Sequence, residues 1–165
     1  MNKKKISRLK KAGKGRQVAA LPVRWTEDGK LEILLVTSRD TGRWVLPKGW
    51  RMDGKSDHQA ASIEAHEEAG ARGYIHKEPL GKFRYRKQLE DGHHLPTDVQ
   101  VYPMVVETLD KTWKEDGERK RKWFSVKQAA KLVHEDQLSD LMRMLKRKPK
   151  KQKALRTRAK KNKPL

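Results

Sequence analysis

The stretch that most constrains this chain runs from Gly49 to Ala71 and reads GWRMDGKSDHQAASIEAHEEAGA. Ser56 is a suitable helix N-cap, and Gln59 follows at the three-residue spacing of a capping box. Gly70 stands where a glycine would end the helix in a left-handed conformation. The second half of the stretch is therefore predicted to be a helix, preceded by a loop.

Three carboxylates lie on one face of this predicted helix. Glu64, Glu67 and Glu68 are spaced by three and four residues, and residues at these spacings project from the same side of a helix. No Lys or Arg occurs between Ser56 and Ala71 to offset their charge. Two interpretations are open: an ordinary solvated surface, or a site for a hard divalent cation such as Mg²⁺, which prefers oxygen ligands.

The same stretch resembles the Nudix box, whose pattern is G-x5-E-x7-R-E-U-x-E-E-x-G-U, with U an aliphatic residue. The matching positions are Gly49, Glu64, Ala65, Glu67, Glu68, Gly70 and Ala71. Lys55 stands where the family has Glu, and Ile63 stands where it has Arg. In relatives these two residues pair and brace the catalytic helix. Because both are replaced here, no buried charge is left unpaired, and we expect a working site that is less rigid or slower.

Segments on both sides of the box extend the resemblance over residues 17–145. GRWVLPKG, GKFRYRK and RKRKWFSVKQAAKLV are similar to segments of the diphosphoinositol-polyphosphate phosphohydrolase branch of the family. The resemblance implies an α+β fold, with a mixed β-sheet sandwiched between helices and the box as a loop–helix–loop. It also implies hydrolysis, dependent on Mg²⁺ or Mn²⁺, of a phosphoanhydride in a nucleoside- or inositol-diphosphate-linked substrate. Dinucleoside polyphosphates and diphosphoinositol polyphosphates are the favoured substrates.

Matching positions imply a role for each box residue. Glu64, Glu67 and Glu68 would be metal ligands, and Glu64 would also be the catalytic base. A main-chain carbonyl at the glycine turn, of Lys48 or Gly49, would be a further ligand. Such metals neutralise phosphate oxygens and lower the pKa of a bound water, whose proton a carboxylate can accept.

Basic residues around the box are candidates for binding a polyanionic substrate. They are Arg39, Arg43, Lys48, Lys82, Arg84 and Arg86. The first three precede the predicted helix closely enough to face its start. The last three alternate along a predicted strand, so they share one face. Solvated surface positions are the alternative for each, and this alternative is slightly favoured for the strand.

The net charge of +20 is concentrated at the two ends of the chain. Residues 1–16 contain eight Lys or Arg and residues 143–165 contain twelve, and neither segment contains Asp or Glu. Like-charged segments with few apolar residues are normally disordered. We therefore expect a disordered basic arm over residues 1–16 and a hydrolase domain over residues 17–142. Residues 143–165 are expected to hold the end of the last helix and a basic tail.

Apolar runs and turn signals predict a strand-rich chain with helices in the middle and near the end. The expected strands or β-prone segments are residues 17–25, 31–38, 44–46, 73–87, 98–109 and 122–124. The first two should form a hairpin around Asp28 and Gly29. Pro103 interrupts the fifth, which predicts an edge strand or a bulge. Ser125, with Gln128, should cap one helix, and residues 136–145 should form another.

Composition excludes several classes of function. Cysteine is absent, so thiol catalysis, disulfides and Cys-based zinc sites are excluded. The sequence has no apolar run of about 18 residues and no apolar segment after its basic start. We expect a cytoplasmic enzyme without a membrane span. The alternative is a non-catalytic Nudix-fold module that binds RNA or polyphosphate through its basic ends.

Overall fold

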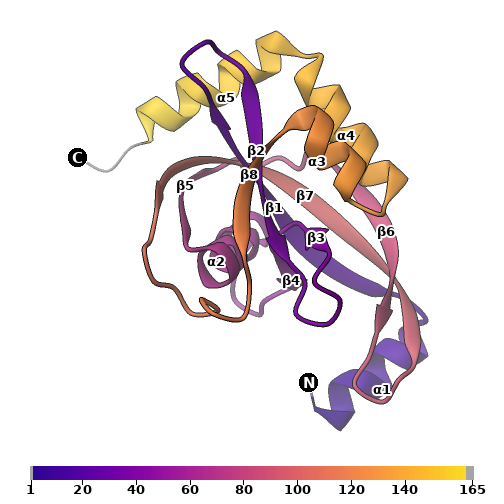
Figure 1. Ribbon diagram of the computed structural model, residues 1–165. Helices are drawn as coiled ribbons and strands as arrows, with labels where there is room; N and C mark the ends of the chain where they lie inside the picture. Colours follow the sequence, from indigo (N-terminus) through magenta and orange to yellow (C-terminus); the bar gives the residue numbers. More distant parts are fainter. Residues whose placement is uncertain (1, 163–165) are drawn as a thin grey trace.

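Two long strands that pair in parallel form the centre of this computed structural model, which describes residues 2–162. They are β1 (Gly15–Trp25) and β7 (His94–Leu109), and their register runs from Gly15 opposite Thr97 to Val23 opposite Val105. The other strands are β2 (Leu31–Thr37), β3 (Trp44–Val45), β4 (Lys48–Trp50), β5 (Ala71–Ile75), β6 (Gly81–Gln88) and β8 (Arg121–Ser125). Together they make a mixed sheet of order β3-β2-β1-β7-β5, in which β4 pairs with β1, β6 with β7 and β8 with β2 (Figure 1).

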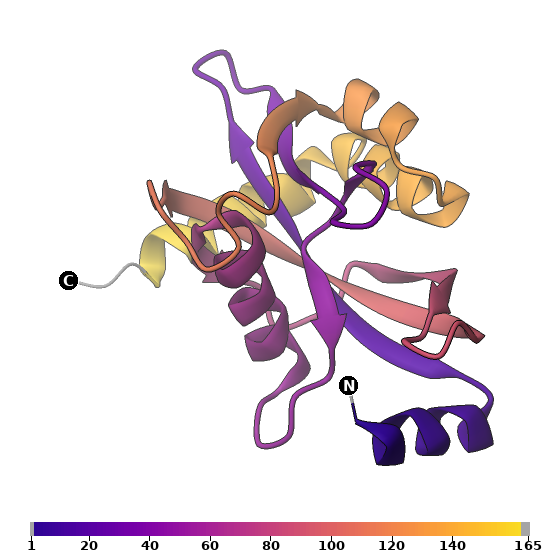
Figure 2. The ribbon, with the colours of Figure 1, turned by 60° about the horizontal axis from the view of Figure 1, so that its bottom comes forward.

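Helices cover both faces of this sheet, as the sequence predicted (Figures 1 and 2). The helices of the described chain are α1 (Lys3–Ala12), α2 (Asp57–Ala69), α3 (Val126–Leu132), α4 (Asp136–Lys146) and α5 (Pro149–Lys161). Side chains of α2 join one buried cluster, and those of α3, α4 and α5 join another. None of the helices within residues 2–162 has the length and apolar character needed to cross a bilayer.

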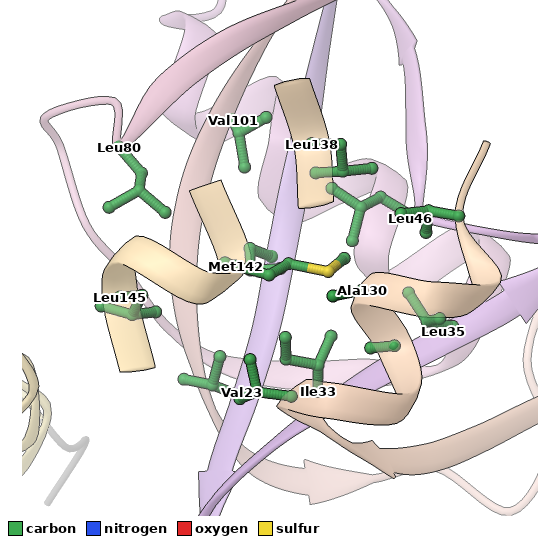
Figure 3. Close-up of a cluster of buried hydrophobic side chains, with 14 of the residues drawn as sticks. Val23, Ile33, Leu35, Leu46, Leu80, Val101, Ala130, Leu138, Met142 and Leu145 are labelled. Atoms are coloured by element: carbon green, nitrogen blue, oxygen red, sulfur yellow. The ribbon is translucent and has the colours of Figure 1, made fainter. Parts of the chain in front are cut away.

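Strand β1 separates the two clusters because its side chains alternate between the faces of the sheet. Val18 and Ala20 pack on the α2 side, whereas Leu21 and Val23 pack on the side of α3 and α4. The second cluster is the larger, and Met142 of α4 lies at its centre among side chains of the sheet (Figure 3). The predicted β1–β2 hairpin is confirmed, with Val23 opposite Ile33.

Helix α2 begins and ends where its local sequence predicts. Ser56 and Gln59 form both hydrogen bonds of a capping box, and Gly70 has a left-handed φ of 64°. The face that packs on the sheet consists of Ala60, Ala61, Ala65 and Ala69, all of which are buried. These small side chains let the helix lie close to β1, and its glutamate side chains then come close to the main chain of β4.

Pro103 lies in the middle of the sheet and not at an edge, and the register shift between β5 and β7 falls away from it, between Arg72 and Gly73, so the prediction of an edge or a bulge at Pro103 was wrong. It pairs with Leu21 of β1 on one side. On the other side its carbonyl accepts a hydrogen bond from the main-chain N–H of His76, between the end of β5 and the start of β6. The missing N–H of proline therefore falls at the gap where the neighbour of β7 changes from β6 to β5.

The two basic ends form helices, in contrast to the disorder expected of them. Asn2 caps α1, and Ile6 and Leu9 of α1 are half-buried. In α5, Leu155 and Ala159 are buried, at the i, i+4 spacing that places both on one helical face. A domain ending at residue 142 would divide α4 and remove Leu145, which is fully buried. The folded unit therefore extends beyond residues 17–142 at both ends; residues 163–165 lie outside the described chain.

Candidate active site

Glu64 and Glu68 lie at the base of a pocket of about 590 Å³ formed by α2, β4, the end of β6 and two loops. The main-chain N–H of Lys48 donates a hydrogen bond to Glu68 Oε1 at 3.2 Å. At the next residue, Gly49, a Cβ atom would overlap the Glu64 carboxylate. Glycine is therefore required for the close approach of β4 to α2. The structure thus brings together Glu64, Glu68, Lys48 and Gly49, as the sequence predicted.

Burial dominates the electrostatics of the two carboxylates. It raises the pKa of Glu64, and the charge of Glu67 raises that pKa further. Burial likewise raises the pKa of Glu68, against the opposing effect of the Arg119 guanidinium. Glu64 and Glu68 line the same pocket. Two acids that resist ionisation at close range form a pair that a cation would stabilise.

Glu67 is directed away from the pocket. Its carboxylate lies 3.5 Å from Lys114 Nζ, and it is absent from the pocket lining. Within residues 2–162, no three His, Asp or Glu side chains gather tightly enough to hold a metal by themselves. The donor set still fits Mg²⁺, which typically takes one or two carboxylates and completes its shell with water and substrate phosphate. Glu64 and Glu68 supply those two carboxylates.

Two charged residues that lie beside Glu68 were missed by the sequence analysis. Glu115 and Arg119 lie in the segment between β7 and β8 and turn into the pocket beside Glu68. Arg119 Nε donates to Glu115 Oε1 at 2.8 Å, its Nη2 lies 3.3 Å from Glu68 Oε2, and its Nη1 donates to the Thr37 carbonyl at 3.0 Å. Their spacing of four residues was visible, but only the return of this loop to α2 brings them to the site.

The three cations that precede the box all line the pocket, as predicted. Arg39 lies 3.6 Å from Glu115, and Arg43 lies 3.4 Å from Glu135. The buried Nη1 of Arg43 has no hydrogen-bond partner in the described chain. The Nζ of Lys48 donates to Tyr85 Oη at 3.1 Å, and burial lowers the pKa of Lys48 to about 8. Arg43 and Lys48 can therefore each accommodate a further acceptor, such as a phosphate oxygen.

Only one of the three cations predicted along β6 reaches the pocket. Arg86 lines it, whereas Lys82 and Arg84 do not. Arg84 Nε donates instead to Asp98 Oδ1 at 2.7 Å, across to the residue that it faces on β7. Lys87, which the sequence analysis did not select, also lines the pocket. The reason is that the strand ends at the pocket rim, where residues of both faces are close to the opening.

The basic N-terminal segment contributes to the same pocket. Lys5 of α1 lines it, with its Nζ 5.2 Å from the centre of the Trp50 ring, a cation–π contact. Lys10 of α1 forms an ion pair with Asp91, with its Nζ 2.5 Å from Asp91 Oδ2. Just after the helix, Lys14 Nζ lies 3.0 Å from Asp98 Oδ2. The arm is therefore a wall of the pocket.

Helix α2 lacks the ion pair of the box and has ionic contacts at other residues. Lys55 is exposed and Ile63 is half-buried. Arg51 Nε donates to Asp57 Oδ1 at 2.9 Å and so ties the glycine loop to the first turn of α2. Arg119 with Glu68 and Lys114 with Glu67 add further ionic contacts to the helix in the absence of the box Arg.

Comparison with known sequences identifies the domain. The sequence model of the NUDIX domain matches residues 15–145. The chain is 33% identical over 110 residues to Nudix hydrolase 13, mitochondrial, of Arabidopsis thaliana, a match that covers 64% of this chain and 54% of that protein. It is 35% identical over 105 residues to human diphosphoinositol polyphosphate phosphohydrolase 3-alpha, covering 62% of this chain and 60% of that protein. The chain thus matches a little over half the length of these curated relatives.

Comparison with solved structures supports the fold. The C. elegans Ap4A hydrolase has a TM-score of 0.56 at 21% identity, covering 78% of this chain and 93% of that one. The MutT protein from Methanosarcina mazei Go1 has a TM-score of 0.60 at 20% identity, covering 83% and 96%. At this level of identity the likeness concerns the arrangement of sheet and helices, which agrees with the α+β fold described above.

Proposed function

Since this chain belongs to the Nudix family, we propose that it hydrolyses a phosphoanhydride bond with the help of Mg²⁺ or Mn²⁺. The observation that carries the proposal is the pair of Glu68, which is buried, and Glu64, which is half-buried, set against the main chain of Lys48 and Gly49 at the base of a cationic pocket. Eight Lys or Arg and four Asp or Glu line that pocket. This charge balance suits a substrate that carries several phosphates.

The residues around the carboxylate pair have defined parts in the proposed reaction. Glu64 and Glu68 would hold the divalent ion, with a carbonyl of Lys48 or Gly49 as a further ligand. When bound, the metal would neutralise phosphate oxygens and acidify a water molecule. Glu64 is the proposed base that accepts the proton of the attacking water. Glu115 is a second carboxylate close enough to influence that proton, because its charge raises the pKa of Glu64.

Substrate binding is assigned to the cations that retain free donors. Arg43 has an unpartnered Nη1, and neither Lys48 nor Arg86 makes an ion pair in the described chain. These three side chains would bind the phosphates from one side, while the metal holds them from the other. Fixing the anhydride between two charged walls orients it for attack by water, and orientation of this kind accounts for much of the rate enhancement in such reactions.

A dinucleoside polyphosphate or a diphosphoinositol polyphosphate is the proposed substrate class. The volume of about 590 Å³ lies within the range of small-molecule sites. Relatives are named for both chemistries: a diphosphoinositol polyphosphate phosphohydrolase by sequence, and an Ap4A hydrolase by fold. The pocket has both a cationic rim for inositol phosphates and an aromatic residue, Trp50, on which a base could stack.

A non-catalytic module that binds polyphosphate is the alternative. It would use the same cations without needing ionised carboxylates at the base of the pocket. The cost of partly desolvating Glu64 and Glu68 in one pocket argues against it, because a binding module for polyanions gains nothing from these two carboxylates.

Phosphate release with Mn²⁺ from a panel of substrates tests the proposal. The panel holds diadenosine polyphosphates, diphosphoinositol polyphosphates, nucleoside triphosphates, nucleotide sugars and 5′-triphosphate RNA. We expect turnover of at least one of the first two, and loss of turnover when a chelator removes the metal. Tight binding of these compounds without turnover of any would favour the module instead.

A further inference from the structure

We propose that α5 and the grooves beside it form a binding surface for single-stranded nucleic acid, separate from the candidate active site. The helix packs on the face of the sheet opposite to α2, because Leu155 belongs to the cluster of α3 and α4 and not to that of α2 (Figures 1 and 2). No residue of α5 lines the active-site pocket. The surface is therefore free to bind while the pocket is occupied.

The charge of α5 is uncompensated. Its exposed cations are Lys150, Lys153, Arg156, Arg158, Lys160 and Lys161. The helix contains no acid, and in the described chain none of its residues makes an ion pair. By comparison, α1 also lacks acids, but Lys10 of α1 is paired with Asp91. The cations of α5 are thus available for phosphate, and each one that neutralises a phosphate releases a counterion.

The helix presents these cations in a fixed arrangement. Leu155 and Ala159 anchor it to the core. Gln152, in the first turn of α5, forms hydrogen bonds with two other segments. Its Nε2 donates to the Leu145 carbonyl at 2.9 Å, and its Oε1 accepts from Trp25 Nε1 at 3.0 Å. Because the surface is already ordered, binding does not have to order a flexible tail, and this lowers its entropic cost.

Grooves beside α5 combine these cations with aromatic rings. Trp25 and Tyr74, both half-buried, line a groove of about 230 Å³ with Arg156 and Lys160. Trp25 also lines a second groove of about 570 Å³, next to Lys153. The Arg156 guanidinium lies 4.9 Å from the centre of the Trp25 ring. Across these grooves and the outer one along Lys150 and Lys161, the lining contains six cations and one acid, Glu107.

The aromatic rings favour a single strand over a duplex. A single strand exposes base faces that stack on aromatic side chains, and surfaces that bind it without sequence preference combine such rings with a positive groove. A duplex offers phosphates but hides its base faces. The cations of α5 alone would suit either, so Trp25 and Tyr74 decide the choice.

Fluorescence anisotropy with a labelled single-stranded RNA of roughly 12 nucleotides, within typical site sizes, tests this inference. The α5 variant carries Lys150→Gln, Lys153→Gln, Arg158→Gln and Lys161→Gln. The matched control carries Lys3→Gln, Lys4→Gln, Arg8→Gln and Lys11→Gln on exposed positions of α1, so both proteins have the same net charge. Gln keeps a helix propensity close to that of Lys, and thermal unfolding verifies that both variants are folded.

We expect the α5 variant to lose at least about tenfold in affinity at low salt and to show a shallower salt dependence, by about 0.7 in the log–log slope for each lost phosphate contact. The α1 control should stay within about twofold of the unaltered chain, since the proposed contacts are intact. Equal losses in the two variants would mean that net charge alone binds RNA, and would overturn the assignment to α5.

A second variant tests the aromatic part. Tyr74→Leu keeps an apolar side chain in the groove but removes the ring. The affinity for the single-stranded RNA should fall at least about fivefold, the low end of the effect of losing one stacked base. A duplex of the same length should bind more weakly than the single strand at matched salt. If the duplex binds equally well and Tyr74→Leu has no effect, the grooves do not bind bases and the proposal fails. Binding to vesicles with anionic lipid, without binding to RNA, would likewise overturn it.

Discussion

At the scale of single residues, the site is a buried cluster of opposite charges. Glu68 and Arg119 are each less than a tenth exposed at the side chain, and Glu115 is only slightly more so. Removing one member of such a cluster leaves the others desolvated and unpaired, which is costly. The glutamates of the box and the Arg119 guanidinium therefore have to be considered together, because each charge is tolerated only in the presence of the other.

Glu68→Gln tests the role of the metal-binding face. The change removes the charge and keeps the shape, and we expect turnover to fall by at least about 100-fold, the lower end of the effect of removing a positioned catalytic group. Mn²⁺ affinity, measured by titration calorimetry, should fall as well, because one of the two carboxylates proposed to bind the metal is lost. Glu107→Gln is the control, since Glu107 is exposed and lies outside this pocket. Wild-type turnover and metal affinity in Glu68→Gln would contradict the assignment.

At the scale of elements, α2 and the loop before it are held without the usual box pair. Arg51 with Asp57 and Arg119 with Glu68 tie this element to its surroundings. Both ties join α2 to segments outside the helix. The small alanine face contributes modestly to hydrophobic stabilisation, so these polar ties should matter for the position of the helix.

Restoring the box pair gives a prediction for this element. Ile63→Arg alone should be neutral or harmful, because the new cation would meet Lys55. The double change Lys55→Glu with Ile63→Arg should exceed the sum of the single changes by roughly 0.5–3 kcal/mol in unfolding free energy, the range for contacting residues. A double-mutant cycle on thermal unfolding measures this coupling. Strict additivity would mean that the two side chains do not meet.

Helix α1 gives a second prediction at this scale. Lys5 lines the pocket beside Trp50, whereas Lys4 is exposed and lines no part of it. Lys5 is not among the residues that contact Glu64 or Glu68, so Lys5→Ala should raise KM several-fold and leave kcat nearly unchanged, the pattern of lost uniform binding. Lys4→Ala should change neither constant. An unchanged KM in Lys5→Ala would show that α1 does not bind substrate.

At the scale of the whole molecule, the basic ends belong to the folded unit. Leu155 of α5 is 2% exposed and joins the same cluster as Met142 and Leu145. Burial of apolar surface is the main stabilising contribution in a domain of this size. We therefore expect the C-terminal segment to contribute to the stability of the hydrolase domain, in addition to carrying charge.

Leu155→Ala measures that contribution. Substitution of a buried leucine by alanine typically costs about 2–5 kcal/mol, through lost burial and the cavity that remains. Leu132→Ala is the matched control, because Leu132 is 38% exposed. Its substitution should lower the free energy of unfolding by well under half as much. Denaturant unfolding of both variants gives the two values. Equal, small losses would show that α5 is not part of the core.

Local sequence was sufficient for the elements that depend on neighbouring residues. The caps of α2, the shared face of Glu64 and Glu68 and the turn between β1 and β2 are set by spacings within a few residues. The same holds for the capping box of α3 at Ser125. These features were predicted because hydrogen bonds and side-chain directions within a helix or a hairpin follow from backbone geometry alone.

Contacts between distant segments were decided only by the tertiary structure. Glu115 and Arg119 reach Glu68 because a loop returns to α2, and Pro103 is tolerated because two strands end beside it. The charge of the two ends predicted disorder, but α5 packs on the core through Leu155 and Ala159, which are buried at helical spacing, and through the hydrogen bonds of Gln152. Composition averages over a segment, whereas burial depends on which few side chains meet a complementary surface. This is why the sequence indicated Glu64, Glu68 and the cations just before the box, and only the fold brought Glu115, Arg119 and Lys5 to the same pocket.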